Sequence, residues 1–317
     1  MAPFPFFVGC GRSGTTLFRA IFDSHPDLAI PGESHFIVHL LPRRRRYEKE
    51  AGFDTGAFLA DLLPHPRFRL WGIADDDVRS ALERDPPSML PEAIRAAFGV
   101  YAARQGKRRY GDKTPGYISH LASLADLFPE ARFVHIVRDG RDVALSYLDV
   151  SFGPSSTEGA ALHWRRLVER GRRAGNRLGP GRYVEVRYED LLADPEATTR
   201  SLCAFLDLGF HPDMFRYPER AAEVAQGSAF PEAHGRLALP PTIGLRDWRT
   251  QMADTDVVAF ELLAGDLLID LGYEVAGTRP DVFARARTTA RRLGIEARRL
   301  AHGVGKRAGI TAGRRGP

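Results

Sequence analysis

The chain has 317 residues, 44% of them hydrophobic and 27% charged, a composition typical of a globular protein with a sizeable core. It contains no apolar run of transmembrane length and no signal-peptide pattern, so we expect neither feature. Only two cysteines occur, Cys10 and Cys203, which excludes a disulfide framework, argues against a structural zinc site and predicts a reduced, cytoplasmic location.

The net charge of +5 is unevenly distributed along the sequence. Residues 285–317 contain ten Lys or Arg and one acidic residue, so this tail carries +9 and the remaining 284 residues carry −4. The basic character is therefore a property of the tail, and the sequence predicts no nucleic-acid partner. The frequent Arg and Ala are typical of a GC-rich bacterial gene.

Short apolar runs alternate with helical patterns along the chain. The runs predict strands at residues 6–8, 28–30, 109–113, 132–137 and 183–187. Apolar residues at three- and four-residue steps predict helices at residues 17–24, 118–127, 140–147, 160–171, 195–206 and 254–271. This alternation predicts an α/β fold with a mainly parallel sheet and helices on both faces. Ligands of such sheets bind beyond the carboxyl ends of the strands.

Residues 40–105 are less regular and contain several prolines and the run Arg43 to Arg46. We interpret this segment as an irregular insertion within a single domain of residues 1–284. The arginine run is a candidate contact for an anionic ligand, although such runs are more often solvated.

A glycine-rich loop follows the first predicted strand and leads into a helix. The loop and the start of the helix comprise Gly11, Arg12, Ser13, Gly14, Thr15 and Thr16. The first turn of a helix has unpaired N–H groups and a positive dipole end, and glycines let the chain wrap closely around an anion. Hydroxyl groups add donors, and Arg12 adds a positive fork suited to phosphate or sulfonate oxygens. The loop therefore predicts an anion site.

A nucleotide kinase is the obvious alternative, but its loop reads G-x-x-x-x-G-K-[ST], and Gly-Lys-Ser/Thr is missing here. The R-S-G-T-T-L loop after the first strand resembles that of sulfotransferases, especially the tyrosylprotein and bacterial branches. This resemblance implies a P-loop-type three-layer fold and a sulfonate donor, PAPS (3'-phosphoadenosine-5'-phosphosulfate), which leaves as PAP. An ATP-dependent phosphotransferase and a non-catalytic anion or nucleic-acid binder remain as alternatives.

PAPS carries a 3'-phosphate that ATP lacks, so a protein that recognises PAPS needs a second anion site. The segment from Val137 to Tyr147 resembles that site in the family, and the resemblance assigns Arg138 and Ser146 to the 3'-phosphate. Arg138 ends a strand and Ser146 lies a little over two helical turns further on.

Two further positions resemble nucleotide contacts of the family. Tyr188 heads the predicted turn Tyr188 to Leu191, and the resemblance places its ring near the adenine. The segment Ile243 to Arg249 loosely resembles a late loop that folds over the nucleotide, and Arg246 is its candidate phosphate contact.

Sulfonate transfer needs a base for the acceptor hydroxyl, stabilisation of the leaving oxygen and in-line alignment. Glu33 leaves the second strand and resembles the glutamate base of tyrosylprotein sulfotransferases, with His35 as the competing base. Lys113 resembles a family lysine that reaches the donor bridge, where it would act with Arg12 on the leaving oxygen. No metal is expected, because Arg, Lys and helix N–H groups can neutralise the leaving phosphate.

We expect residues 40–105 to form much of the acceptor side of the site, where the run Arg43 to Arg46 could contact an anionic acceptor. The acceptor remains open, with a saccharide, a lipid-linked glycan, a phenolic metabolite and a peptide tyrosine as candidates. In the tail, residues 285–317, apolar residues recur at helical steps among arginines, which is a basic amphipathic pattern. Its apolar face is mostly alanine and Gly294 weakens a helix, so the pattern favours a disordered tail over a helix on an anionic membrane surface. The oligomeric state is not predicted.

Overall fold

The computed structural model describes residues 2–220, 246–277 and 282–312. The chain divides into two compact units, Met1–Arg138 with Leu167–Ile243, and Asp139–Arg166 with Gly244–Pro317. No helix among the described residues is both long and apolar enough to cross a membrane.

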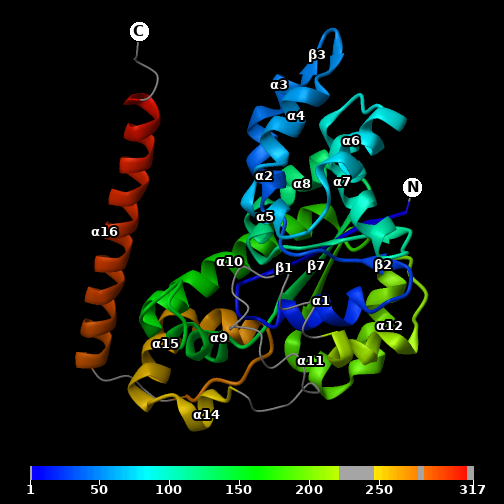
Figure 1. The fold of residues 1–317 in the computed structure, drawn as a ribbon. Helices are drawn as coiled ribbons and strands as arrows, with labels where there is room; N and C mark the ends of the chain where they lie inside the picture. The colour runs from blue at the N-terminus through cyan, green and yellow to red at the C-terminus, as the bar shows by residue number, and fades with distance from the viewer. Residues whose placement is uncertain (1, 221–245, 278–281, 313–317) are drawn as a thin grey trace. The chain divides into compact units, whose positions relative to one another are not determined.

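A four-stranded parallel sheet forms the centre of the first unit (Figure 1). Its strand order is β6-β1-β7-β8, with β1 at Phe4–Gly9, β6 at Asp112–Lys113, β7 at Ala131–Val137 and β8 at Tyr183–Arg187. Phe6 of β1 lies opposite Asp112 on one side and Phe133 on the other. Because all four strands run in one direction, their carboxyl ends meet at the same edge of the sheet.

The strand predicted at residues 109–113 is divided at Gly111. Its first half, β5 (Arg109–Tyr110), pairs in parallel with β2 (Leu28–Ala29), whereas its second half is β6 and pairs with β1. A Cβ at Gly111 would lie 3.0 Å from Cγ and 3.2 Å from the carbonyl oxygen of Pro5. The strands approach this closely because residue 111 has no side chain.

Helices cover both faces of the sheet, which confirms the predicted three-layer α/β fold (Figure 1). Phe4, Phe6 and Val8 pack in one core cluster, together with α4 (Thr55–Leu62), α7 (Leu90–Arg104), η2 (Pro115–His120) and α8 (Leu121–Leu127). Phe7 packs in the other cluster, together with α1 (Thr15–Asp23), α11 (Tyr188–Ala193), α12 (Pro195–Phe205) and η3 (Pro212–Arg220). Burial of both faces explains why β1 is apolar at nearly every position.

Residues 40–105 are mostly helical rather than irregular. They contain the end of α2 (Phe36–Leu40), then η1 (Leu41–Arg43), α3 (Arg44–Tyr47), the β3 (Glu48–Lys49) and β4 (Gly52–Phe53) hairpin, α4, α5 (Pro66–Arg69), α6 (Asp75–Arg84) and α7. Pro66 and Pro91 stand in the first turns of α5 and α7, where proline is compatible with a helix. Phe58, Trp71 and Phe98 pack in the same cluster as β1, so this segment completes the core.

Three of the four arginines in the run Arg43 to Arg46 form ion pairs within their own segment. Arg43 and Arg46 form ion pairs with Asp61 at 2.9 and 3.0 Å, and Arg44 pairs with Glu48 at 2.6 Å. Two carboxylates therefore offset about half of the charge of the four arginines.

The second unit is helical. It contains α9 (Gly140–Leu148), α10 (Thr157–Leu178) as far as Arg166, α14 (Trp248–Gln251), α15 (Asp254–Asp270) and α16 (Val282–Ala312). Fully buried Arg141 of α9 contacts α15 through an ion pair to Glu261 at 2.6 Å and α14 through the Trp248 ring, whose centre lies 3.5 Å from the guanidinium. It also forms an ion pair with Asp139 at 2.7 Å. The flat guanidinium suits both bidentate pairing and stacking.

The sequence pattern favours a disordered tail, but Val282–Ala312 is a single helix. The side chains of this helix are described as far as Arg298. The regular apolar steps outweigh the low helix propensity of Gly294. Residues 313–317 lie outside the described part.

Candidate functional site

The loop between β1 and α1 has the form of an anion cradle. Arg12 and Gly14 both adopt left-handed backbone conformations, with φ of 70° and 85°. This conformation costs a non-glycine residue about 1–2 kcal/mol, and such strain is concentrated at functional sites. No side chain of the described residues caps α1, and its first turn contains no acidic residue. Ser13 Oγ is buried without a hydrogen-bond partner among the described residues, which suits a ligand that supplies one.

The Tyr188 ring connects this loop with Arg138. A Cβ at Gly14 would lie 2.2 Å from Cδ2 of Tyr188, so only glycine allows the ring to pack on the loop. The Arg138 guanidinium lies 4.7 Å from the centre of the same ring, within the range of a cation–π interaction. Residues after β1, β7 and β8 are thus brought together at the carboxyl edge, as the sequence predicts.

Glu33 is held between Lys113 and His35. Lys113 Nζ donates to Glu33 Oε1 at 2.7 Å, and His35 Nε2 lies 3.0 Å from Glu33 Oε2. Lys113 is 2% exposed and Glu33 24% exposed. Burial raises the pKa of Glu33, but Lys113 and His35 more than offset it, so that the net pKa lies well below its ordinary value. Burial lowers the pKa of Lys113, and Glu33 opposes that shift. Glu33 is therefore a carboxylate at neutral pH.

A buried hydrogen-bond network fixes the loop that presents Glu33. The backbone N–H of Ser34 donates to Thr114 Oγ1 at 3.0 Å, and the Ser34 hydroxyl lies 2.8 Å from the Tyr117 hydroxyl. Thr114 in turn donates to Asp112 at 3.3 Å. Burial raises the pKa of Asp112 to about 6, although hydrogen bonds from Ser34 and Thr114 lower it. The network joins the Glu33 loop to the residues on either side of Lys113, and so positions the pair.

Ser146 and Arg246 belong to the second unit, whereas the other predicted site residues belong to the first, so each is described by itself. Ser146 is buried on α9. Arg246 forms an ion pair with Asp149. Residues 243–245 of the late loop lie outside the described part. The assignments of Ser146 and Arg246 to phosphates stay predictions.

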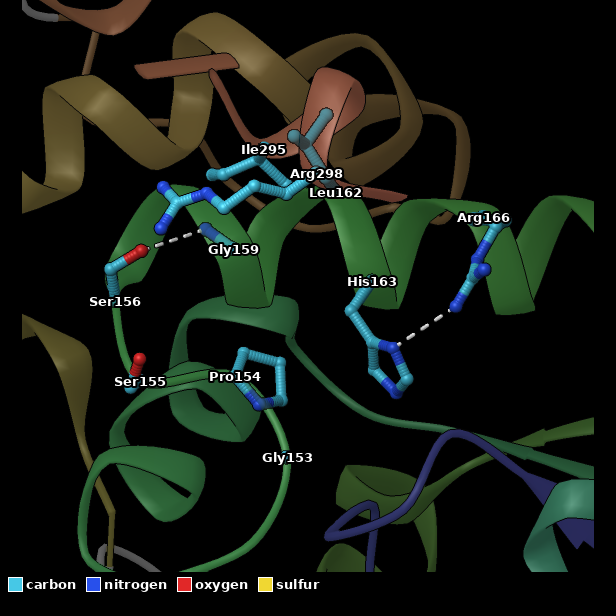
Figure 2. Close-up of a pocket in the computed structure, with 10 residues that line it drawn as sticks. All are labelled: Gly153, Pro154, Ser155, Ser156, Gly159, Leu162, His163, Arg166, Ile295 and Arg298. Carbon is cyan, nitrogen blue, oxygen red and sulfur yellow. Dashed lines mark hydrogen bonds between the residues drawn. The ribbon is translucent and has the colours of Figure 1, made fainter. Parts of the chain in front are cut away.

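A cavity of about 570 Å³ lies in the second unit (Figure 2). It is lined by the loop Gly153 to Ser156, by Gly159, Leu162, His163 and Arg166 of α10, and by Ile295 and Arg298 of α16. None of the predicted site residues lines it.

Sequence reasoning missed a second buried polar group, a chain of contacts around His135 of β7. His135 Nδ1 lies 2.6 Å from the Tyr183 hydroxyl, which donates to Glu185 at 2.7 Å, and Glu185 accepts from Arg172 at 3.2 Å. Burial, with a smaller effect of Arg172, lowers the pKa of His135 to about 3. The one available signal was a histidine within the apolar run Phe133 to Val137.

Comparisons with known proteins indicate a family for this chain. A sequence model described as the sulfotransferase family matches residues 3–212. Protein-tyrosine sulfotransferase A of Caenorhabditis elegans is 24% identical over 286 residues, which cover 88% of this chain and 70% of the relative. The protein-tyrosine sulfotransferase of Drosophila melanogaster is 28% identical over 222 residues, which cover 68% of this chain and only 40% of the relative.

Two solved structures share the fold. The sulfotransferase domain from the curacin biosynthetic pathway superimposes with a TM-score of 0.59 at 20% identity, covering 87% of this chain and 99% of that domain. The sulfotransferase domain of the Synechococcus PCC 7002 olefin synthase gives a TM-score of 0.59 at 23% identity, covering 86% of this chain and 95% of that domain.

Proposed function

Because the chain belongs to the sulfotransferase family, we propose that it transfers a sulfonate group from PAPS to a hydroxyl acceptor, with Glu33 as the base. The observation that supports this most directly is the Glu33–Lys113 pair, 2.7 Å apart, beside the sheet edge where the anion loop begins. The family match disfavours the alternatives of an ATP-dependent phosphotransferase and a non-catalytic binder.

The residues of the loop fit a phosphosulfate donor. The uncapped start of α1 offers backbone N–H groups to an anion, and the buried Ser13 hydroxyl lacks a partner among the described residues. Arg12 supplies positive charge at the same loop. Arg138, whose guanidinium contacts the Tyr188 ring, is the proposed contact of the 3'-phosphate. In the bound complex the donor supplies an electrophilic sulfur.

The proposed reaction is a single displacement. The acceptor hydroxyl gives its proton to a Glu33 carboxylate oxygen while its own oxygen forms the bond to sulfur. The bond from sulfur to the phosphate oxygen breaks, and that oxygen keeps the electron pair. Lys113 and Arg12 stabilise the charge that develops there. Because Lys113 pairs with Glu33 in the structure, any movement of its charge toward the leaving oxygen raises the pKa of Glu33 and strengthens the base.

We propose a tyrosine phenol as the first acceptor to test. Two of the relatives are named protein-tyrosine sulfotransferases, although the chain spans less than half of the Drosophila protein. A carboxylate with a lowered pKa is a weak base and therefore suits a phenol, whose pKa of about 10 is far below that of a saccharide hydroxyl. A metal-free reaction and a cytoplasmic location stay predictions.

Ligand-induced shifts in melting temperature test the donor. PAP should raise the melting temperature of the full chain more than ATP with Mg²⁺ does, since a ligand that binds only the folded state stabilises it. The proposal is wrong if ATP with Mg²⁺ stabilises the chain and PAP does not.

The base is tested by Glu33→Gln, with Glu83→Gln on the exposed face of α6 as the matched control. Glu33→Gln should keep the melting shift with PAP and lose transfer of labelled sulfonate from PAPS to a tyrosine peptide, whereas Glu83→Gln should keep both. If Glu33→Gln retains turnover and His35→Asn abolishes it, His35 is the base instead.

A further inference from the structure

Helix α16 has two faces of different character. Thr288, Arg291 and Ile295 follow one another at steps of three and four residues and lie on the face turned to the rest of the second unit. Thr288 is buried, Arg291 pairs at 2.7 Å with the buried carboxylate of Glu158, and Ile295 lines the cavity that α10 also lines (Figure 2). These contacts fix which side of the helix points outward.

The outward side carries an apolar stripe. Val282, Phe283 and Leu293 are 78%, 85% and 60% exposed. At about 100° per residue they share a face with the exposed Ala286, Ala290 and Ala297. Within the described side chains nothing covers this stripe, and in the sequence Leu300 and Val304 continue its spacing.

Arginines flank the stripe on both sides. Arg285 and Arg292 lie along one edge, and Arg287 and Arg298 lie along the other, where Arg298 also lines the cavity shared with α10. Arg292 is paired with Glu296, but no described residue forms an ion pair with Arg285 or Arg287. The helix therefore presents apolar side chains between two rows of positive charge, on the opposite side from the face that holds it to the protein.

We propose that this outward face of α16 docks on an anionic lipid surface. Exposed apolar side chains enter the acyl boundary while flanking arginines contact lipid phosphates, which is how interfacial helices bind. A nucleic acid would use the arginines but leave the stripe in water. A second copy of the helix would bring rows of arginine into opposition, which disfavours pairing. This inference does not depend on the sulfotransferase activity.

Co-sedimentation of the full chain with vesicles tests the proposal. The chain should bind vesicles of phosphatidylserine and phosphatidylcholine, should bind pure phosphatidylcholine far more weakly, and should dissociate as salt is raised. Each arginine near an anionic surface strengthens binding roughly fivefold, so Arg285→Glu with Arg287→Glu should weaken it about 20-fold or more. The matched control is Arg79→Glu with Arg84→Glu on α6, which makes the same charge change and should have little effect.

The apolar stripe is tested separately by Phe283→Ser with Leu293→Ser, which should weaken binding roughly tenfold. Leu70→Ser with Ile269→Ser removes two other exposed apolar side chains and should not. Circular dichroism and a cooperative thermal unfolding transition verify that every variant is folded. Absence of vesicle binding by the wild type, or equal losses in the α16 and control variants, overturns the proposal. The proposal is also overturned if the wild type binds no vesicles and forms a dimer in sedimentation velocity that the α16 substitutions dissociate.

Discussion

The Glu33–Lys113 pair predicts an asymmetry in stability that follows from the unequal burial of its two members. At 2.7 Å, opposite unit charges attract by roughly 6 kcal/mol at an effective dielectric constant of about 20, before the cost of burial. Removing one partner of a buried pair costs about 3–5 kcal/mol because the other charge is left uncompensated. Lys113 is 2% exposed, whereas Glu33 is 24% exposed and also contacts His35.

We therefore expect Glu33→Gln to lower the free energy of unfolding by about 2–3 kcal/mol, less than the full cost because glutamine still accepts a hydrogen bond from Lys113. Lys113→Met removes the buried charge itself and should cost about 1 kcal/mol, because Glu33 keeps His35 and water. In the Lys113→Met background, Glu33→Gln should cost less than about 0.5 kcal/mol more, a clear departure from additivity.

Urea unfolding at pH 7 measures these values, with Glu196→Gln of the exposed Glu196–Arg200 pair as a control expected to cost at most about 0.5 kcal/mol. The folded pKa of Glu33 is depressed, so its contribution is fully present above its ordinary pKa of 4.5 and is lost as the pH falls below that value. The difference between wild type and Glu33→Gln should thus shrink as the pH falls below 4.5. A double variant no more stable than Glu33→Gln would refute the reasoning.

Three further predictions concern neighbouring residues. Gly14→Ala places a Cβ 2.2 Å from Tyr188 at φ 85° and should abolish the melting shift with PAP, while Gly181→Ala, whose Cβ meets nothing within 4 Å, should leave it intact. Arg138→Lys should weaken PAP binding at least tenfold but leave adenosine 5'-phosphosulfate, which lacks the 3'-phosphate, unaffected in competition assays. The His135 pKa of about 3 lies below its ordinary 6.5, so this residue stabilises the fold fully above pH 6.5 and progressively less as the pH falls toward 3. The slope of the unfolding free energy against pH in that range should therefore decrease in His135→Gln, by the equivalent of up to one proton. An unchanged slope would contradict the lowered pKa of His135. Asp112 contributes a slope of the opposite sign, but it does so equally in wild type and variant.

The sequence was sufficient to predict the sheet and the loop because both depend on local patterns. Apolar runs such as residues 132–137 and the turn chemistry of Arg12 to Gly14 are visible without tertiary structure. The helices of residues 40–105 escaped prediction because several are short and prolines stand in their first turns. Similarly, the turn predicted at Tyr188 is the start of α11.

The geometry of the site depended on contacts between distant residues. Glu33 and Lys113 are 80 positions apart, and their pairing depends on the network of Ser34, Thr114 and Tyr117, whose individual residues carry no distinctive signal. The packing of Tyr188 on Gly14 likewise joins residues from opposite ends of the first unit's sequence. The sequence was sufficient to propose candidate residues for the site. The contacts of Glu33 and its protonation state could be determined only from the structure.

The central position of β1 has a consequence for how the chain folds during synthesis. The partners of Phe6 are Asp112 and Phe133, more than a hundred residues later in the chain. The ribosome therefore releases the apolar segment Phe4–Gly9 long before either neighbouring strand exists. Pairing of such distant strands is slow, and an apolar strand left unpaired in the meantime is prone to aggregate. Expression at low temperature or with a chaperone that shields nascent chains should thus raise the soluble yield more than any change at the surface.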